Sequence, residues 1–434
     1  MNRNPLSLLI AFLAILALSA CQSAAVTEAR TPLPPTATAY TERTPTPLPT
    51  VTPVVVSGTV SIWHSWEDPY VPALLRRIHE FNQGYPSVYF DVTYIPAVDM
   101  RAAYEHAALE GRGPTLMIGE GGWGPALYDQ GLVADLSSGV PPEVLNTLNP
   151  AAVGTGRYKG ALVSVPVDIG GIVLYRNQSI IPIPPPTFDE LISLSRQATR
   201  GQIVGAILDR SFFFSGAHLI GLGGSLMSPE GEPAFLNLKG LEWVGLLQAY
   251  AEAGPTEFFS DNDANVFKEG HAGFILEGTW NRQALAEAIG VENLAIDPWP
   301  IHAGGSLSGF VKAEAIYLDS RALDEPYEVS LKFLLYLLSP ESQGALAEVG
   351  LIPSINGSPV NLAANRVQVK DVLTNQAMRA LADGTTYPVL PVMSVYTNQM
   401  DIALISIFND GVPAEEALKR AEEAIRAALD NPAP

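Results

Sequence analysis

Tryptophan and carboxylate side chains gather in this sequence just beyond the ends of expected strands. Five of the six tryptophans occupy such positions: Trp63, Trp66, Trp123, Trp280 and Trp299. Flat indole faces pack against the C–H faces of sugar rings, and carboxylates accept hydrogen bonds from hydroxyl groups. The nearby acceptors are Glu67, Glu120, Asp168 and Glu277. As a set these residues predict a site for a polyhydroxy ligand, whereas any one tryptophan can equally fill space between a sheet and its helices.

The elements that would position these side chains alternate along the chain. Residues 59–63 predict a short strand, and the polar and aromatic loop 64–68 follows it. Apolar residues recur at helical spacing over 71–81, and residues 88–94 alternate as a strand does. This order predicts an α/β fold with a largely parallel sheet, in which ligands bind outside the carboxyl ends of the strands.

Later segments continue the alternation of strands and helices. Residues 203–208 and 271–276 are strand candidates, whereas 331–338 and 417–428 have the apolar patterns of helices. Trp243 lies within a helical apolar stripe, so we expect it to be an ordinary core residue.

Composition restricts the class of protein and of ligand. The 434 residues are 47% hydrophobic and 16% charged, which is enough to bury one or two sizeable cores. The formal net charge of -20 repels phosphate backbones, so we expect no nucleic acid partner. The same sign weighs mildly against anionic ligands.

The amino-terminal segment predicts export and membrane attachment. An apolar run from Leu6 to Leu18 follows Arg3 and ends in small residues before Cys21, the one cysteine of the chain. The arrangement resembles a bacterial lipobox, which implies cleavage before Cys21 and lipid attachment to its thiol. A buried helix with a chance cysteine is the alternative. Residues 27–53 are mostly Thr and Pro and predict an extended stalk of up to roughly 80 Å, which leaves O-glycosylation open.

Several short motifs resemble the extracellular solute-binding proteins of ABC importers, the family 1 group similar to maltose-binding protein. The likeness covers residues 58–434, and its order and spacing carry more weight than any single piece. The matching segments are 60–66, 81–86, 131–136, 184–191, 267–274, 278–280 and 333–343. One departure is Pro114-Thr115, where the family often has Pro-Asp before its second ligand strand.

The resemblance implies an α/β, two-lobe, periplasmic-binding-protein-like fold of type II with a ligand cleft between the lobes. Hinge crossings would lie near 165–170, 299–304 and 350–354. The implied domains are a signal peptide at 1–20, the lipidated cysteine and linker at 21–57, an N-terminal lobe at 58–167 plus 301–352, and a C-terminal lobe at 168–300 plus 353–434.

The resemblance also implies the site and the partners. The expected ligand contacts are Trp63, His64, Trp66, Glu67, Glu120, Trp123, Asp168, Phe213 and Trp280. The expected ligand is a carbohydrate, most readily an oligosaccharide, that a monomeric, lipid-anchored protein outside the cytoplasm delivers to an ABC permease. We expect no catalysis and no cofactor. The histidines are scattered without the spacing of a zinc site, so we also expect no metal.

Three other functions compete with this interpretation. Residues 119–124 match the G-x-G-x-x-G dinucleotide fingerprint, but Glu120 and Trp123 would repel and crowd a pyrophosphate. A secreted, lipid-anchored glycoside hydrolase would use two carboxyls from a larger set: Glu67, Asp68, Glu120, Asp168 and Glu277. Ser306 lacks the glycine two residues later that a nucleophile elbow needs. An adhesive lipoprotein would need the stalk but no closing cleft.

Overall fold

The computed structural model describes residues 56–430, except 323 and 366–368. The predicted signal segment, Cys21 and nearly all of the predicted linker lie outside the described residues. The described residues belong to one compact unit. Among the described residues, no helix combines the length and the apolar character that a membrane crossing requires.

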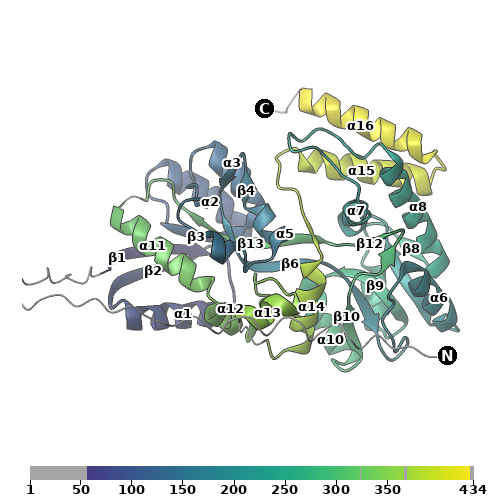
Figure 1. Ribbon diagram of the computed structural model, residues 1–434, viewed down its shortest axis with the longest axis horizontal. Helices are drawn as coiled ribbons and strands as arrows, with labels where there is room; N and C mark the ends of the chain where they lie inside the picture. Colours follow the sequence, from purple (N-terminus) through teal and green to yellow (C-terminus); the bar gives the residue numbers. More distant parts are fainter. Residues whose placement is uncertain (1–55, 323, 366–368, 431–434) are drawn as a thin grey trace, which may run out of the picture. The chain divides into compact units, whose positions relative to one another are not determined.

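The strands of this unit belong to one large sheet and two small hairpins (Figure 1). Their bounds are β1 (Ser57–His64), β2 (Ser87–Tyr94), β3 (Leu116–Glu120), β4 (Arg157–Tyr158), β5 (Ala161–Leu162), β6 (Val165–Asn177), β7 (Val204–Asp209), β8 (Thr256–Glu257), β9 (Ala272–Gly278), β10 (Leu294–Asp297), β11 (Ile301–His302), β12 (Gly305–Ser306), β13 (Phe310–Leu318) and β14 (Thr385–Thr386).

Helices connect these strands and cover both faces of the sheet. Their bounds are α1 (Tyr70–Gly84), α2 (Ala97–Leu109), α3 (Gly124–Asp129), α4 (Pro142–Leu145), α5 (Pro150–Thr155), α6 (Phe188–Ala198), α7 (Phe212–Gly221), α8 (Leu238–Ala253), α9 (Asn262–Lys268), α10 (Arg282–Ile289), α11 (Asp324–Leu337), α12 (Pro340–Ala347), α13 (Pro359–Asn365), α14 (Val372–Ala382), α15 (Met393–Phe408) and α16 (Ala414–Asp430). Two 3-10 turns, η1 (Gly121–Trp123) and η2 (Thr279–Asn281), precede α3 and α10.

The large sheet has ten strands and confirms the predicted α/β class. Its main order is β2-β1-β3-β13-β6-β9-β7-β8, with β10 on β6 and β14 on β13. Parallel pairs occur within β1–β3 and within β7–β9. β13 runs antiparallel to β3 and β6 but parallel to the short β14, and β6 runs antiparallel to β9 and β10. The sheet is therefore mixed rather than largely parallel, because β6 and β13 join two parallel groups of opposite direction.

The buried core explains where the sheet leaves a cleft. One continuous cluster covers a whole face of the sheet and includes Val167, Ile169 and Val173 of β6. The opposite face carries two separate clusters, one around Tyr317 and one around Trp243. Because side chains alternate along a strand, Asp168 points away from the continuous cluster, whereas Ile172 and Leu174 farther along β6 pack in the cluster around Trp243.

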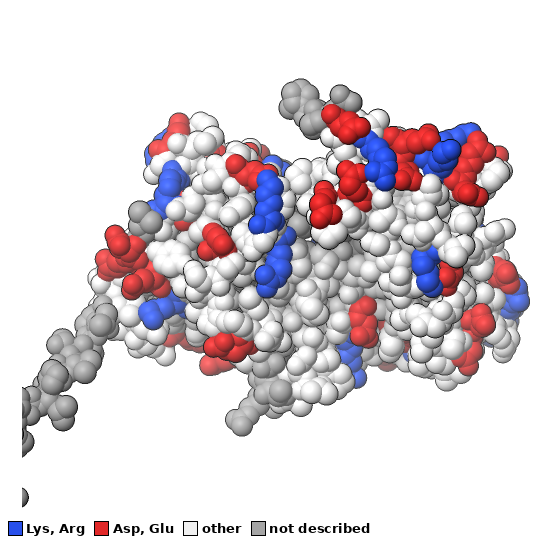
Figure 2. Space-filling model, turned by 45° about the horizontal axis from the view of Figure 1, so that its top comes forward, with Lys and Arg blue, Asp and Glu red and all other residues white. Residues whose placement is uncertain are grey.

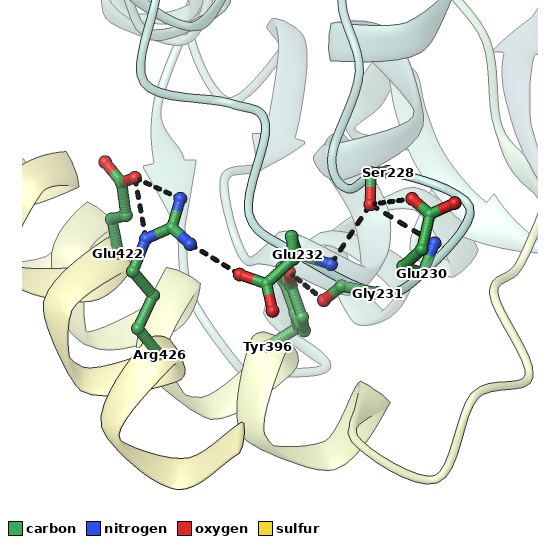
Figure 3. A network of polar contacts seen from close by, with 7 residues as sticks. All are labelled: Ser228, Glu230, Gly231, Glu232, Tyr396, Glu422 and Arg426. Carbon is green, nitrogen blue, oxygen red and sulfur yellow. Dashed lines mark hydrogen bonds and ion pairs between the residues drawn. The ribbon is translucent and has the colours of Figure 1, made fainter. Parts of the chain in front are cut away.

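The C-terminal helices α15 and α16 pack side by side and are fastened to the loop before α8 (Figure 3). The Arg426 guanidinium pairs with Glu232 of that loop and with Glu422 on its own helix. The Tyr396 hydroxyl donates to the Gly231 carbonyl at 2.8 Å. These contacts hold the first turn of α15, which lines one of the cavities described below.

Charge is distributed rather than concentrated on the visible face of the protein. Figure 2 shows the described Lys and Arg residues interspersed with Asp and Glu on that face. Four ion pairs among the described residues involve α16, including those of Lys419 and Arg420 with acidic residues one turn away. Such exposed pairs add little stability individually.

Candidate functional site

Trp123 and Trp280 follow sheet strands in similar local structures. β3 ends at Glu120 and runs through η1 into α3, whereas β9 ends at Gly278 and runs through η2 into α10. A Cβ atom on Gly119 would lie 2.4 Å from the Trp123 ring, and one on Gly278 would lie 2.0 Å from the Trp280 ring. Glycine at each strand end therefore lets an indole lie directly over the backbone.

Three acidic residues form a row across neighbouring strands between these tryptophans. Glu314 of β13 pairs in register with Glu120 of β3 on one side and with Asp168 of β6 on the other. A register shift follows between Glu314 and Ala315. Residues directly opposite on adjacent strands share a face, so three carboxyl groups lie side by side, an arrangement that costs stability when like charges meet. We call these three residues the acidic row.

Each member of the acidic row has a different partner. The Lys312 ammonium pairs with Glu120 at 2.9 Å. The Trp66 indole N–H donates to the Glu314 carboxyl, and the Ile352 backbone N–H donates to Asp168 at 2.7 Å. The row is thus held by one cation, one side-chain donor and one backbone donor, which come from three separate parts of the chain.

Burial raises the pKa of two members of the acidic row, Asp168 and Glu314. Burial raises the pKa of Asp168 well above its ordinary value, and the Glu314 charge adds to the increase, while the Ile352 N–H and Arg282 oppose it. Burial also raises the pKa of Glu314, against the hydrogen bonds from Trp66 and Ser65. Such shifts concentrate at functional sites, although structural networks also produce them.

A first cavity of about 290 Å³ opens over Asp168 and Glu314. Its wall combines polar and aromatic groups, including Tyr70, Trp280 and Arg282. Trp280 is 56% exposed. Its ring stacks on Phe213 with ring centroids 6.2 Å apart and an interplanar angle of 27°. An exposed indole, supported from behind, is therefore available to a ligand beside the carboxyl groups.

A second cavity of about 330 Å³ lies over Glu120 and Lys312. Trp123 and Tyr387 contribute aromatic surface to it. The Lys312 ammonium lies 5.9 Å from the centre of the Phe213 ring and 5.6 Å from that of Tyr387. Because Phe213 also stacks on Trp280, a chain of contacts runs from Lys312 in the wall of the second cavity to Trp280 in the wall of the first. We call the two cavities together the cleft.

The structure brings together four of the nine predicted ligand contacts and places a fifth, Phe213, behind one of them. Glu120, Trp123, Asp168 and Trp280 line the two cavities, and Phe213 supports Trp280. Trp66 is only 3% exposed. Its indole N–H donates to the Glu314 carboxyl, and its ring is too deeply buried to stack on a ligand.

Four other residues lie away from the two cavities. Trp63 is partly buried and packs against the core cluster that contains α2 residues, and His64 is buried with its ring 5.9 Å from that of Tyr94. Glu67 is exposed and accepts a hydrogen bond from the Tyr94 hydroxyl at 3.0 Å. Trp299 does not converge on the cleft with the other tryptophans, because it is 6% exposed and packs in the core around Trp243.

Sequence reasoning missed several residues of the cleft. Glu314 and Lys312 lie within a nine-residue strand that is otherwise almost entirely apolar, and this interruption was an available signal. Tyr70 and Arg282 lie at helix starts whose position over the cleft depends on the tertiary fold. Tyr387 follows the two-residue strand β14 and carried no recognisable pattern.

The chemistry that the cleft offers is recognition through hydrogen bonds and aromatic contact. Carboxyl oxygens accept from hydroxyl groups, Lys312 and Arg282 can donate, and the indole of Trp280 can cover an apolar ring face. Among the described residues, no group of three or more His, Cys, Asp or Glu side chains is placed to hold a metal ion.

The sheet and cleft define a two-lobed α/β ligand-binding protein, in which two strand groups meet on β6 and β13 beside the cleft. The chain belongs to the bacterial extracellular solute-binding protein family, whose model matches residues 76–370. Membership of this family places the protein outside the cytoplasm. The family is one of binding proteins, and it gives no support to the hydrolase alternative.

Individual relatives are distant in sequence. The chain is 22% identical to the maltotriose-binding protein of Pyrococcus abyssi over 54% of its own length, and spans about half (52%) of that relative. It is 21% identical to the galactooligosaccharide-binding protein of Bacillus subtilis, covering 73% of this chain and 77% of that relative.

Solved structures share the fold. A solute-binding protein of Staphylococcus aureus in complex with maltose has a TM-score of 0.76 at 18% identity, covering 87% of this chain and 99% of that one. The cyclic alpha-maltosyl-1,6-maltose binding protein of Arthrobacter globiformis has a TM-score of 0.74 at 21% identity, covering 86% and 100%. These likenesses confirm the predicted two-lobed fold.

Proposed function

We propose that this protein captures an oligosaccharide in the cleft and delivers it to an ABC permease, without chemically changing it. The observation that carries the proposal is the exposed Trp280 ring, which stacks on Phe213 and borders the same cavity as Asp168 and Glu314. An indole face next to carboxyl groups suits a molecule with an apolar ring face and a hydroxylated edge. The relatives that bind maltotriose and galactooligosaccharides support this ligand class.

Each cavity residue would make a particular kind of contact with the ligand. Trp280 would stack on one sugar ring, and Trp123 with Tyr387 would contact a second ring in the other cavity. Asp168, Glu314 and Glu120 would receive hydroxyl hydrogens, while Arg282 and Lys312 would donate to ring or hydroxyl oxygens. Two adjoining cavities favour a ligand of more than one ring.

Binding would close the cleft by moving two lobes about their connections. We propose lobes at 58–167 plus 301–352 and at 168–300 plus 353–434, with β6 and β13 as the strands that both lobes share. A ligand that contacts both lobes binds the closed form more tightly and shifts the population toward it. The closed form would be the one that a permease recognises.

The remaining parts of the proposal concern attachment and assembly. Cys21 would carry the lipid, the Thr- and Pro-rich segment would separate the folded unit from the membrane, and the protein would act as a monomer. Mass spectrometry of the protein purified from membranes tests the anchor directly. A lipid-modified amino-terminal Cys21 is expected, and an unmodified cysteine behind an intact leader would contradict it.

Thermal unfolding against a panel of sugars tests the function itself. Maltose, maltotriose, maltotetraose and galactooligosaccharides are suitable probes, each followed by chromatography of the recovered sugar. A bound sugar at about 100 times its dissociation constant should add about 2.7 kcal/mol to the free energy of unfolding. Stabilisation with intact sugar is expected. Cleavage of the sugar would contradict the absence of catalysis, and no stabilisation by any saccharide would contradict the ligand class.

A further inference from the structure

Two carboxyl groups of the acidic row share one cavity with a single counter-charge. Asp168 and Glu314 are directly paired in register and both line the first cavity. Arg282 is the one basic residue among the described residues that line it. A guanidinium balances one carboxylate, so two ionised carboxyls would leave an uncompensated negative charge in a largely buried place.

Neutral donors reach both carboxyl groups of the pair, including Ser65 at Glu314 and the Ile169 backbone at Asp168. Asp168 uses Oδ1 to accept from the Ile352 N–H, and Glu314 uses Oε2 to accept from the Trp66 indole. Like-charged groups directly opposite on neighbouring strands repel, and two carboxyls that share a site commonly retain one proton. Proton sharing removes the excess charge without displacing either partner.

We propose that Asp168 and Glu314 hold one proton between them at neutral pH, so that the cleft presents one carboxylic acid and one carboxylate to its ligand. The pair then offers a hydrogen-bond donor as well as acceptors, which an ionised pair lacks. The proposal concerns the regulation of the cleft and rests on the proposed function for its effect on ligand binding.

The neighbouring titratable groups Tyr70 and Glu120 do not neutralise the excess negative charge of the pair. The Tyr70 hydroxyl faces the same cavity, and burial together with the Asp168 and Glu314 charges raises its pKa, so it stays neutral. Glu120, the third member of the acidic row, is paired with Lys312, and that exposed ion pair carries no net charge. Burial raises the pKa of both Asp168 and Glu314, which agrees with the geometry.

The sign of the pH dependence follows from what a ligand does to the pair. A sugar in the cavity removes water from the pair and makes a second negative charge still less favourable, so the complex holds the proton more tightly than the free protein does. Affinity is then constant at low pH. It falls by up to tenfold for each pH unit above the apparent pKa of the free pair, and levels off above that of the complex.

Infrared spectroscopy of the full protein without ligand tests the proton itself. Other buried acids contribute to the carboxylic acid band, so the informative quantity is the difference spectrum between wild type and each variant at pH 7. Asp168→Asn and Glu314→Gln keep the acceptor oxygens for Ile352 and Trp66. We expect either substitution to remove one carboxylic acid C=O band. Glu120→Gln, the matched control in the same row, should leave that band in place. Spectra in which neither substitution removes a band would overturn the proposal.

Calorimetric titration with maltotriose or a galactooligosaccharide then tests the linkage. Titrations at one pH in two buffers of different ionisation enthalpy give the number of protons taken up on binding. Above neutral pH we expect proton uptake by wild type and by Tyr89→Ala, whose exposed side chain lines neither cavity, and no uptake by Asp168→Asn. Binding without proton exchange, or with proton release, would overturn the linkage. A wild-type protein that shows the carboxylic acid band but binds no saccharide would instead refute the proposed function, while the shared proton would stand.

Discussion

Removing the Trp280 ring gives the most informative test of the cleft. The side chain is 56% exposed in the ligand-free protein. A tryptophan presents roughly 250 Å² in total, so roughly 140 Å² remains accessible, and a sugar stacked on one face would cover about half of that. At about 25 cal/mol per Å², the covered area of roughly 70 Å² corresponds to about 1.8 kcal/mol, or a roughly 20-fold loss of affinity in Trp280→Ala.

The assay for this prediction is calorimetric titration with the saccharide that stabilises the protein most. Tyr89→Ala is the matched control, because this aromatic side chain is 69% exposed on the edge strand β2 and lines neither cavity. The control should bind normally. Because Trp280 is more than half exposed, its removal should change the free energy of unfolding little. A loss of affinity below threefold in Trp280→Ala, with the fold intact, would refute the stacking role.

Three further predictions concern the surroundings of the cleft. Gly278→Ala introduces a methyl group where the Trp280 ring lies, so affinity should fall toward that of Trp280→Ala; an unchanged dissociation constant would show that the ring position is unimportant. Trp66→Phe removes the indole donor from the Glu314 carboxyl and should lower the free energy of unfolding in urea by about 1 to 3 kcal/mol, whereas unchanged stability would show that this bond contributes nothing. Burial lowers the pKa of His218 to about 4, below its ordinary value of 6.5, so the folded state binds this proton less readily than the unfolded chain. Stability should therefore decrease as pH falls from about 6.5 to about 4, by at most about 3 kcal/mol, and a His218→Gln variant with the same pH profile as wild type would contradict this.

Local patterns were sufficient to predict many of the elements. The expected strands at 88–94 and 203–208 correspond to β2 and β7, and the helix expected at 417–428 lies within α16. Apolar alternation and helical periodicity depend only on nearby residues, which is why they are visible in a single sequence.

The acidic row could not be predicted because it depends on long-range register. Glu314 meets Asp168 and Glu120 only after β13 inserts between β3 and β6, and no local pattern fixes which residues of these strands stand opposite each other. Similarly, Trp66 follows β1 in a loop typical of ligand contacts, but its indole bonds to a carboxyl 248 residues later in the chain. Because of this long-range contact, Trp66, which we predicted to contact the ligand, instead supports Glu314.

A crystal structure of the protein with its best-stabilising saccharide tests the central claim most directly. Our account predicts a sugar ring stacked on Trp280, with hydroxyl groups in hydrogen-bonding distance of Asp168 and Glu314. A saccharide bound elsewhere on the protein, or bound in the cleft without contact to Trp280 and the acidic row, would contradict it.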